Sequence, residues 1–126
     1  MIYGIGVDIV EISRVRQMRE KHGTAFLEKC FTAEETAFCL RKSNADESFA
    51  ARFAAKEAVM KALGTGWGQG VAFGNIEVVR DGSGAPAVRL LGGAETAMRA
   101  RGIARVHLSL SHSREYAVAQ AVAECG

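Results

Sequence analysis

One long alanine-rich segment, Ser48 to Gly66, constrains the fold more than any other part of the sequence. It contains no proline and no glycine before Gly64, so it predicts the longest helix of the chain. At 100° per residue its large apolar side chains share one narrow sector, which predicts a core-facing stripe of Phe49, Phe53, Met60 and Leu63. Glu57 and Lys61 lie one turn apart on a neighbouring face. A core helix with charges beside its apolar stripe suggests a use besides packing.

Length and composition indicate a single domain over residues 1–126. The chain is 48% hydrophobic and 24% charged, which excludes disorder, and a net charge of +2 gives no general case for nucleic acid. No apolar run approaches the roughly 18–20 residues that span a bilayer, so we expect no membrane segment. The three cysteines are widely spaced without a CxxC pair, which favours reduced thiols and a cytoplasmic location.

The first strand, Ile2 to Ile12, has two unlike faces. Tyr3, Ile5, Val7 and Ile9 alternate with Gly4, Gly6 and Asp8. Glycine weakens a strand unless something requires it, so this second face is expected to admit another backbone or a ligand.

The other helices and strands are predicted from caps, turns and shorter patterns. A capping box at Thr32 predicts one helix, Ser13 is a plausible N-cap for a helix through His22, and Asn44 or Asp46 can cap the long helix. Asp81-Gly82-Ser83-Gly84 predicts a hairpin between two strands. The remaining expected elements are a helix at Gly92–Arg101 and strands at Arg105–Ser111 and Tyr116–Ala123. Early helices and late antiparallel strands predict an α+β fold, an antiparallel sheet packed against one long central helix plus shorter helices.

Asp8 and Glu57 are the first candidates for chemistry. Both are poorly placed for solvent, and buried carboxylates need a partner. Mg²⁺ takes one or two carboxylates together with waters and phosphate oxygens. Structural ion pairs, of Glu57 with Lys61 or of Asp8 with Arg52, explain the same residues and are the commoner arrangement.

Phosphate binding is the second candidate chemistry. Lys61 precedes Gly64-Thr65-Gly66, where a helix end can free backbone amides, although an ordinary C-cap explains the glycines equally well. His112 follows a predicted strand among hydroxyl and cationic neighbours and can hold a phosphate, or is simply solvated.

A basic helix face is the third candidate. Arg14, Met18 and Lys21 follow helical spacing and fit an acidic, partly apolar helix of a partner, although a solvated charged face is the plainer interpretation. Arg52 and Lys56 are expected to extend toward solvent, and the sequence gives Lys56 no further role.

Three stretches in order carry a family resemblance. They are Ile5–Val10 (IGVDIV), Phe49–Ala62 (FAARFAAKEAVMKA) followed by Gly64-Thr65-Gly66, and Leu108–His112 (LSLSH). Together they closely resemble the holo-acyl-carrier-protein synthases, the small bacterial 4′-phosphopantetheinyl transferases, over essentially the full chain.

This resemblance implies a 4′-phosphopantetheinyl transferase-like fold and a Mg²⁺-dependent transfer of 4′-phosphopantetheine from coenzyme A to a serine of apo acyl carrier protein. Adenosine 3′,5′-bisphosphate is the other product, and the reaction supports fatty acid biosynthesis. By match of residues, Asp8 and Glu57 would hold Mg²⁺ and Lys61 would contact the phosphates, with Gly64, Thr65 and Gly66 beside it. Arg52 and His112 would face the 3′-phosphate end of coenzyme A, and Arg14, Met18 and Lys21 would dock the carrier protein.

The family is also a homotrimer with active sites between subunits. We expect Gly4 and Gly6 to admit coenzyme A or a neighbouring subunit, and Phe73 or Trp67 to supply apolar surface. The base that accepts the serine proton is Glu57 or a metal-held water, and the water is favoured because an ion reduces the basicity of its ligand. Two other classes compete with the enzyme: a binding module for an acidic helix that has lost activity, and a small nucleotide-binding protein unrelated to carrier proteins.

Overall fold

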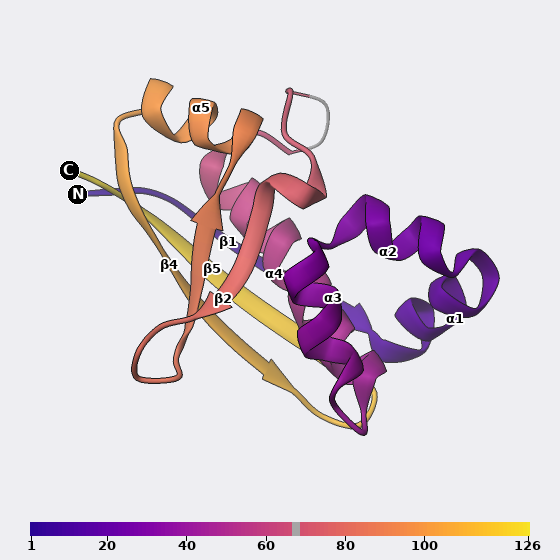
Figure 1. Ribbon diagram of the computed structural model, residues 1–126. Coiled ribbons are helices and arrows are strands. Elements are labelled where there is room, and N and C mark those ends of the chain that lie inside the picture. Colours follow the sequence, from indigo (N-terminus) through magenta and orange to yellow (C-terminus); the bar gives the residue numbers. More distant parts are fainter. Residues whose placement is uncertain (67–68) are drawn as a thin grey trace.

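The computed structural model describes residues 1–66 and 69–126. Helix α4, Ala45–Leu63, lies at its centre (Figure 1). It begins three residues before the predicted start and ends at Gly64, whose φ of 77° is the left-handed conformation that glycine favours. Asn44 occupies the N-cap position but donates to the Glu47 side chain instead of capping the helix, and Asp46 lies inside the first turn. A side-chain cap from either residue was therefore a wrong prediction.

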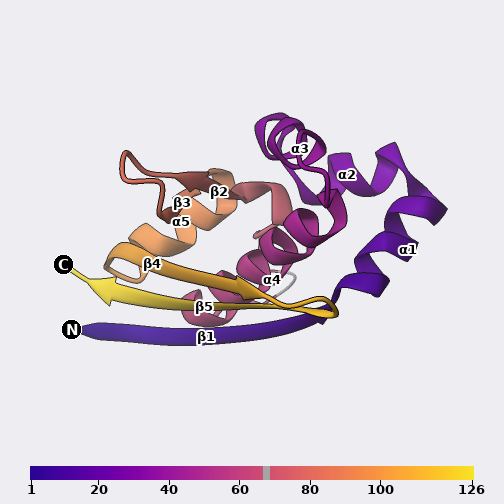
Figure 2. The same ribbon diagram turned by 90° about the horizontal axis from the view of Figure 1, so that it is seen from below.

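The main sheet lies against one side of α4 (Figure 2). Its three antiparallel strands are β1 (Ile2–Glu11), β5 (Tyr116–Cys125) and β4 (Ile103–His112), in the order β1-β5-β4. The inward positions of β5 are buried alanines: Ala117, Ala119, Ala121 and Ala123. Small side chains on the sheet and on α4 allow the two to approach closely. This close approach limits the size of the β1 side chains that can face the helix.

Gly4 and Gly6 of β1 face α4 of the same chain. A Cβ atom at Gly4 would overlap the carbonyl oxygen of Ala62, and one at Gly6 would overlap that of Ala58. The glycines are thus required by close approach of another backbone, the first of the two expected reasons. The expectation that they admit coenzyme A or a second subunit was wrong, because α4 occupies that space.

Three short helices join β1 to α4: α1 (Ile12–His22), α2 (Thr24–Cys30) and α3 (Ala33–Leu40). Glu11, not Ser13, stands at the N-cap of α1, where the Ile12 amide donates to the Glu115 carbonyl of the β4–β5 turn. The Thr32 capping box of α3 is confirmed, with bonds in both directions between Thr32 and Glu35.

A second, two-stranded sheet lies on the opposite side of α4 from the main sheet (Figure 2). It contains β2 (Ile76–Arg80) and β3 (Pro86–Leu90), preceded by the 3-10 turn η1 (Phe73–Asn75) and followed by α5 (Gly92–Ala100). The α+β prediction is confirmed, with α4 between these layers and buried on nearly all sides. Phe49, Met60 and Leu63 are core as predicted, whereas Phe53 is partly exposed.

The outer face of the main sheet is covered by no helix of the described chain (Figure 2). Ile5, Val7 and Ile9 of β1 are 57–64% exposed there. Phe73, expected as surface, is instead 5% exposed, and the Trp67 prediction lies outside the described residues. Among the described helices, none combines the length and apolarity needed to cross a membrane.

Candidate active site

The two predicted acids meet in one cavity of about 290 Å³. Asp8 follows the glycines on the inward face of β1, and Glu57 projects from the fourth turn of α4. Arg14 and Met18 of α1 line the same cavity. The glycine contacts that seat β1 on α4 therefore also bring Asp8 to Glu57.

Charge in this cavity is only partly balanced. Burial and the charge of Asp8 raise the pKa of Glu57, while Lys61 and Arg14 act against that rise. Lys61 Nζ donates to the Val7 carbonyl at 2.9 Å and lies 3.4 Å from Asp8 Oδ1. The ion pair that forms is thus Lys61–Asp8; within the described residues neither Glu57–Lys61 nor Asp8–Arg52 is paired.

This donor set fits a divalent cation. Two carboxylates that repel each other across a part-open cavity gain most from a hard cation between them. Asp8 and Glu57 would supply the protein oxygens, leaving the other positions to water and phosphate.

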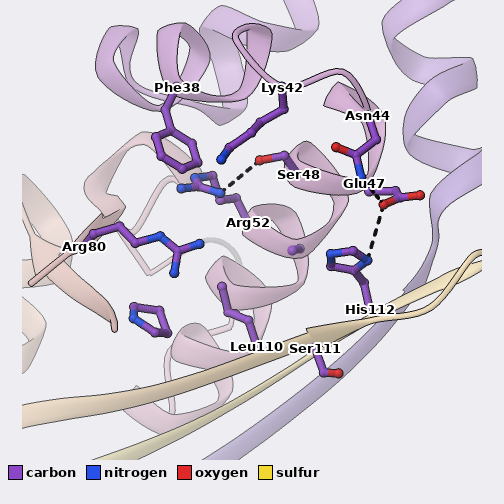
Figure 3. Close-up of a pocket in the computed structure, with 12 residues that line it drawn as sticks. Phe38, Lys42, Asn44, Glu47, Ser48, Arg52, Arg80, Leu110, Ser111 and His112 are labelled. Atoms are coloured by element: carbon purple, nitrogen blue, oxygen red, sulfur yellow. Dashed lines mark hydrogen bonds and ion pairs between the residues drawn. The ribbon is translucent and has the colours of Figure 1, made fainter. Parts of the chain in front are cut away.

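Arg52 and His112 lie in a different cavity, of about 350 Å³ (Figure 3). Lys42 and Arg80 add two cations to it, and neither was predicted as a site residue. These four residues come from the turn after α3, from α4, from β2 and from β4, so no local spacing in the sequence could have indicated them together. Such a collection of cations suits a phosphate.

The Arg52 guanidinium is the unusual group in this cavity. It is 3% exposed, with its Cζ atom 4.3 Å from the centre of the Phe38 ring and its NH1 donating to Ser48 Oγ at 3.2 Å. Its Nε has no hydrogen-bond partner, and no described carboxylate forms an ion pair with it. Burial lowers the pKa of Arg52, opposed by Cys39 and Glu35. A buried cation without an anion is the feature expected of an anion site, and extension into solvent was a wrong prediction.

His112 ends β4 rather than lying in a loop. Its Nδ1 is 3.4 Å from Glu47 Oε2, the oxygen that also accepts from Asn44 (Figure 3). Glu47 thus holds the imidazole at the rim of the cationic cavity.

The turn after α4 differs from its prediction. The amides of Gly64, Thr65 and Gly66 donate to the carbonyls of Lys61 and Met60, and Thr65 is 4% exposed. The turn is therefore a C-cap, and free amides were a wrong physical basis for phosphate binding there. Lys21, in the last turn of α1, is exposed and lines neither cavity.

Lys56, which the sequence left without a role, is fully buried. Its Nζ donates to Glu35 Oε1 at 2.7 Å, to the Phe73 carbonyl at 3.1 Å and to the Ile76 carbonyl. These three acceptors match the three N–H groups of an ammonium. Lys56 therefore joins α4 to α3, η1 and β2, and the prediction of extension toward solvent was wrong.

A carboxylate pair in one cavity and a separate cationic cavity are features that would suit an enzyme acting on phosphate esters. The sequence model of the 4′-phosphopantetheinyl transferase superfamily matches residues 4–121, and the chain belongs to this superfamily. Within it, the chain is 48% identical to the holo-[acyl-carrier-protein] synthase of Halothermothrix orenii, with all of both chains covered.

Solved structures agree with this relationship. The holo-[acyl-carrier-protein] synthase of Neisseria meningitidis is 39% identical, with a TM-score of 0.91 over 98% of this chain and 99% of that one. The enzyme of Helicobacter pylori, solved in complex with coenzyme A, is 32% identical, with a TM-score of 0.84 over 95% of this chain and 99% of that one.

Proposed function

We propose that the protein transfers 4′-phosphopantetheine from coenzyme A to a serine hydroxyl of apo acyl carrier protein, in support of fatty acid biosynthesis. The observation that carries this proposal is the cavity shared by Asp8, Glu57, Arg14 and Met18. In it Asp8 and Glu57, the two proposed metal ligands, lie beside Arg14 and Met18, whose basic and apolar side chains would suit an acidic helix. The unpaired cysteines Cys30, Cys39 and Cys125 support a cytoplasmic location.

Asp8 and Glu57 would hold Mg²⁺, which supplies charge neutralisation at the diphosphate when bound. The serine oxygen forms a bond to the phosphorus that carries pantetheine. The bond from that phosphorus to the bridging oxygen breaks, and adenosine 3′,5′-bisphosphate leaves. Lys61, 52% exposed, can turn from Asp8 toward the phosphate oxygens. Glu57 is the chain's own candidate for the serine proton, and a cation held by the same carboxylate would reduce its basicity.

The 3′-phosphate of coenzyme A is assigned to the cationic cavity. Arg52, Lys42 and Arg80 would supply its charge, and His112 lies at its rim. The unpaired Nε of Arg52 supports the assignment. A contribution from Gly64, Thr65 and Gly66 stays a prediction. Its support is their position next to Lys61, not free amides.

We also infer a homotrimer with active sites between subunits. The cavity of Asp8 and the cavity of Arg52 share no lining residue, so one subunit can supply the first and its neighbour the second. The exposed isoleucines and valine of β1 offer apolar surface for the contact. Val7→Glu should give a monomer by light scattering, while Arg99→Glu on the exposed face of α5 should not. A wild-type chain that is monomeric at micromolar concentration would remove this inference.

Mass spectrometry tests the reaction directly. Apo acyl carrier protein incubated with coenzyme A, Mg²⁺ and the protein should gain the phosphopantetheine mass, and a chelator should prevent it. Glu57→Ala should abolish the gain in a folded protein. Binding of the carrier protein without a mass shift would favour a binding module instead.

Docking of the carrier protein has its own test. Arg14→Glu should raise KM for the carrier protein far more than KM for coenzyme A, because Arg14, Met18 and Lys21 form the proposed docking face for the carrier protein. Equal effects on both constants would remove this docking assignment.

A further inference from the structure

Two buried carboxylates, Glu35 and Glu77, line one cavity with the unpaired Arg52. Glu77 Oε1 forms an ion pair with Arg89 at 2.7 Å, which leaves Glu35 as the carboxylate that could pair with Arg52. Glu35 is 2% exposed and Arg52 3%, and both line a third cavity of about 280 Å³ with Phe38 and Arg80. A buried carboxylate and a buried guanidinium in one cavity would ordinarily form an ion pair, since each otherwise remains uncompensated. They do not pair here, although the guanidinium keeps a free N–H.

The reason lies in what else holds Glu35. Its Oε1 accepts from Lys56 Nζ at 2.7 Å and from the Thr32 amide at 3.0 Å, and its Oε2 accepts from the Val78 amide at 2.9 Å. Both oxygens are occupied and the charge is neutralised by Lys56. Glu35 therefore acts on Arg52 only at a distance, through its charge, and forms no ion pair or hydrogen bond with it.

We propose that Lys56 is a positioning residue: by neutralising Glu35, it leaves the Arg52 guanidinium available to a phosphate in the cationic cavity. Lys56 lies one helical turn after Arg52 on α4, so the two cations share one face of the helix. One binds the internal carboxylate, and the other is left for the external anion. This inference rests on the proposed assignment of the 3′-phosphate to Arg52.

The proposal predicts a selective loss in Lys56→Met. With Glu35 unneutralised, Arg52 turns toward it and away from the phosphate. The readout is the ratio of kcat/KM for coenzyme A to that for dephospho-coenzyme A, which lacks the 3′-phosphate. We expect this ratio to fall about tenfold, the value of one charge-assisted hydrogen bond.

Charge removal at Glu35 should reverse that loss. In Glu35→Gln/Lys56→Met both buried charges are gone, and the ratio should return to within about threefold of wild type. The matched control is Glu34→Gln/Lys56→Met, because Glu34 is an exposed acid lining the same cavity and should not restore the ratio. Calorimetric binding of adenosine 3′,5′-bisphosphate against adenosine 5′-monophosphate should follow the same order without turnover.

Four results would overturn the proposal. Equal loss for both substrates in Lys56→Met would leave Lys56 a purely structural role, and so would rescue by Glu34→Gln as good as by Glu35→Gln. If Lys56→Met does not fold, Lys56→Gln is measured in its place, because its amide can still donate to the Phe73 and Ile76 carbonyls. An unchanged substrate ratio in Lys56→Gln also overturns the proposal. A wild-type ratio near one would remove the Arg52 assignment and this inference with it, while the mass shift of the carrier protein would still establish the transferase.

Discussion

Substitution of Gly6 by alanine tests how β1 is seated on α4. The added Cβ would overlap the Ala58 carbonyl oxygen and lie 2.9 Å from both the Ala62 amide nitrogen and Lys61 Cβ. Two of these three atoms belong to the backbone of an unbroken helix, which cannot rotate away. Strand and helix must separate to make room.

The cost follows from that geometry. Overpacking a well-filled interior costs typically 1–3 kcal/mol, and contact with backbone rather than a flexible side chain places Gly6→Ala near the upper end, at about 3 kcal/mol. For a chain of 126 residues this corresponds to a fall in Tm of about 10 °C. The separation also draws Asp8, two residues further along the same face, away from Glu57, so thermal stabilisation by Mg²⁺ should weaken.

Circular dichroism melts, with and without Mg²⁺, measure both effects. The control is Gly82→Ala in the β2–β3 turn, where a Cβ meets no atom within 4 Å. Its effect should stay within about 0.5 kcal/mol. A Gly6→Ala melt within about 2 °C of wild type would refute the reasoning that close approach requires this glycine.

Three further predictions concern α4. Lys56→Met alone should lower the free energy of unfolding by about 3–5 kcal/mol in urea titrations, because it leaves the buried Glu35 charge without a partner. Glu35→Met/Lys56→Met should recover most of this loss. Additive losses from the two substitutions would contradict this. Burial and Asp8 raise the pKa of Glu57, so the ionised carboxylate destabilises the folded state once the pH exceeds that pKa. In the absence of metal, Glu57→Gln should therefore raise Tm at neutral pH. In acid, where Glu57 is protonated, the variant should lose this advantage. Arg52→Met should raise Tm while raising KM for coenzyme A, since it removes a buried cation without an anion; a lower Tm would show that Arg52 stabilises the fold.

The sequence predicted those parts of the fold that rest on local periodicity. Alternation in β1 separated the Gly4 and Asp8 face from the apolar face, and the Thr32 capping box located the start of α3. The caps of α1 and α4 were wrong because the Ile12 amide is satisfied by a distant carbonyl and Asn44 by a nearby carboxylate. In both cases the group has several possible hydrogen-bond partners, and only the tertiary structure decides which one it takes.

The candidate site divides in the same way. Asp8 and Glu57 could be proposed as a pair, and the shared cavity brings them together. Lys42 and Arg80 could not be proposed as site residues, because only the folded chain brings them beside Arg52, which lies in another element. The sequence indicates that Lys56 lies on α4. It does not indicate the partner, Glu35, because 21 residues and a helix boundary separate the two.

The Lys56–Glu35 pair also bears on how such chains can diverge. Either residue can be replaced by an apolar one only through an intermediate that carries a lone charge in the interior. Selection against that intermediate should make substitutions at the two positions occur together or not at all. Glu35 is held further by the Thr32 and Val78 amides, so the lysine is the position expected to change first. In an alignment of relatives, positions 35 and 56 should therefore covary although neither contacts the substrate.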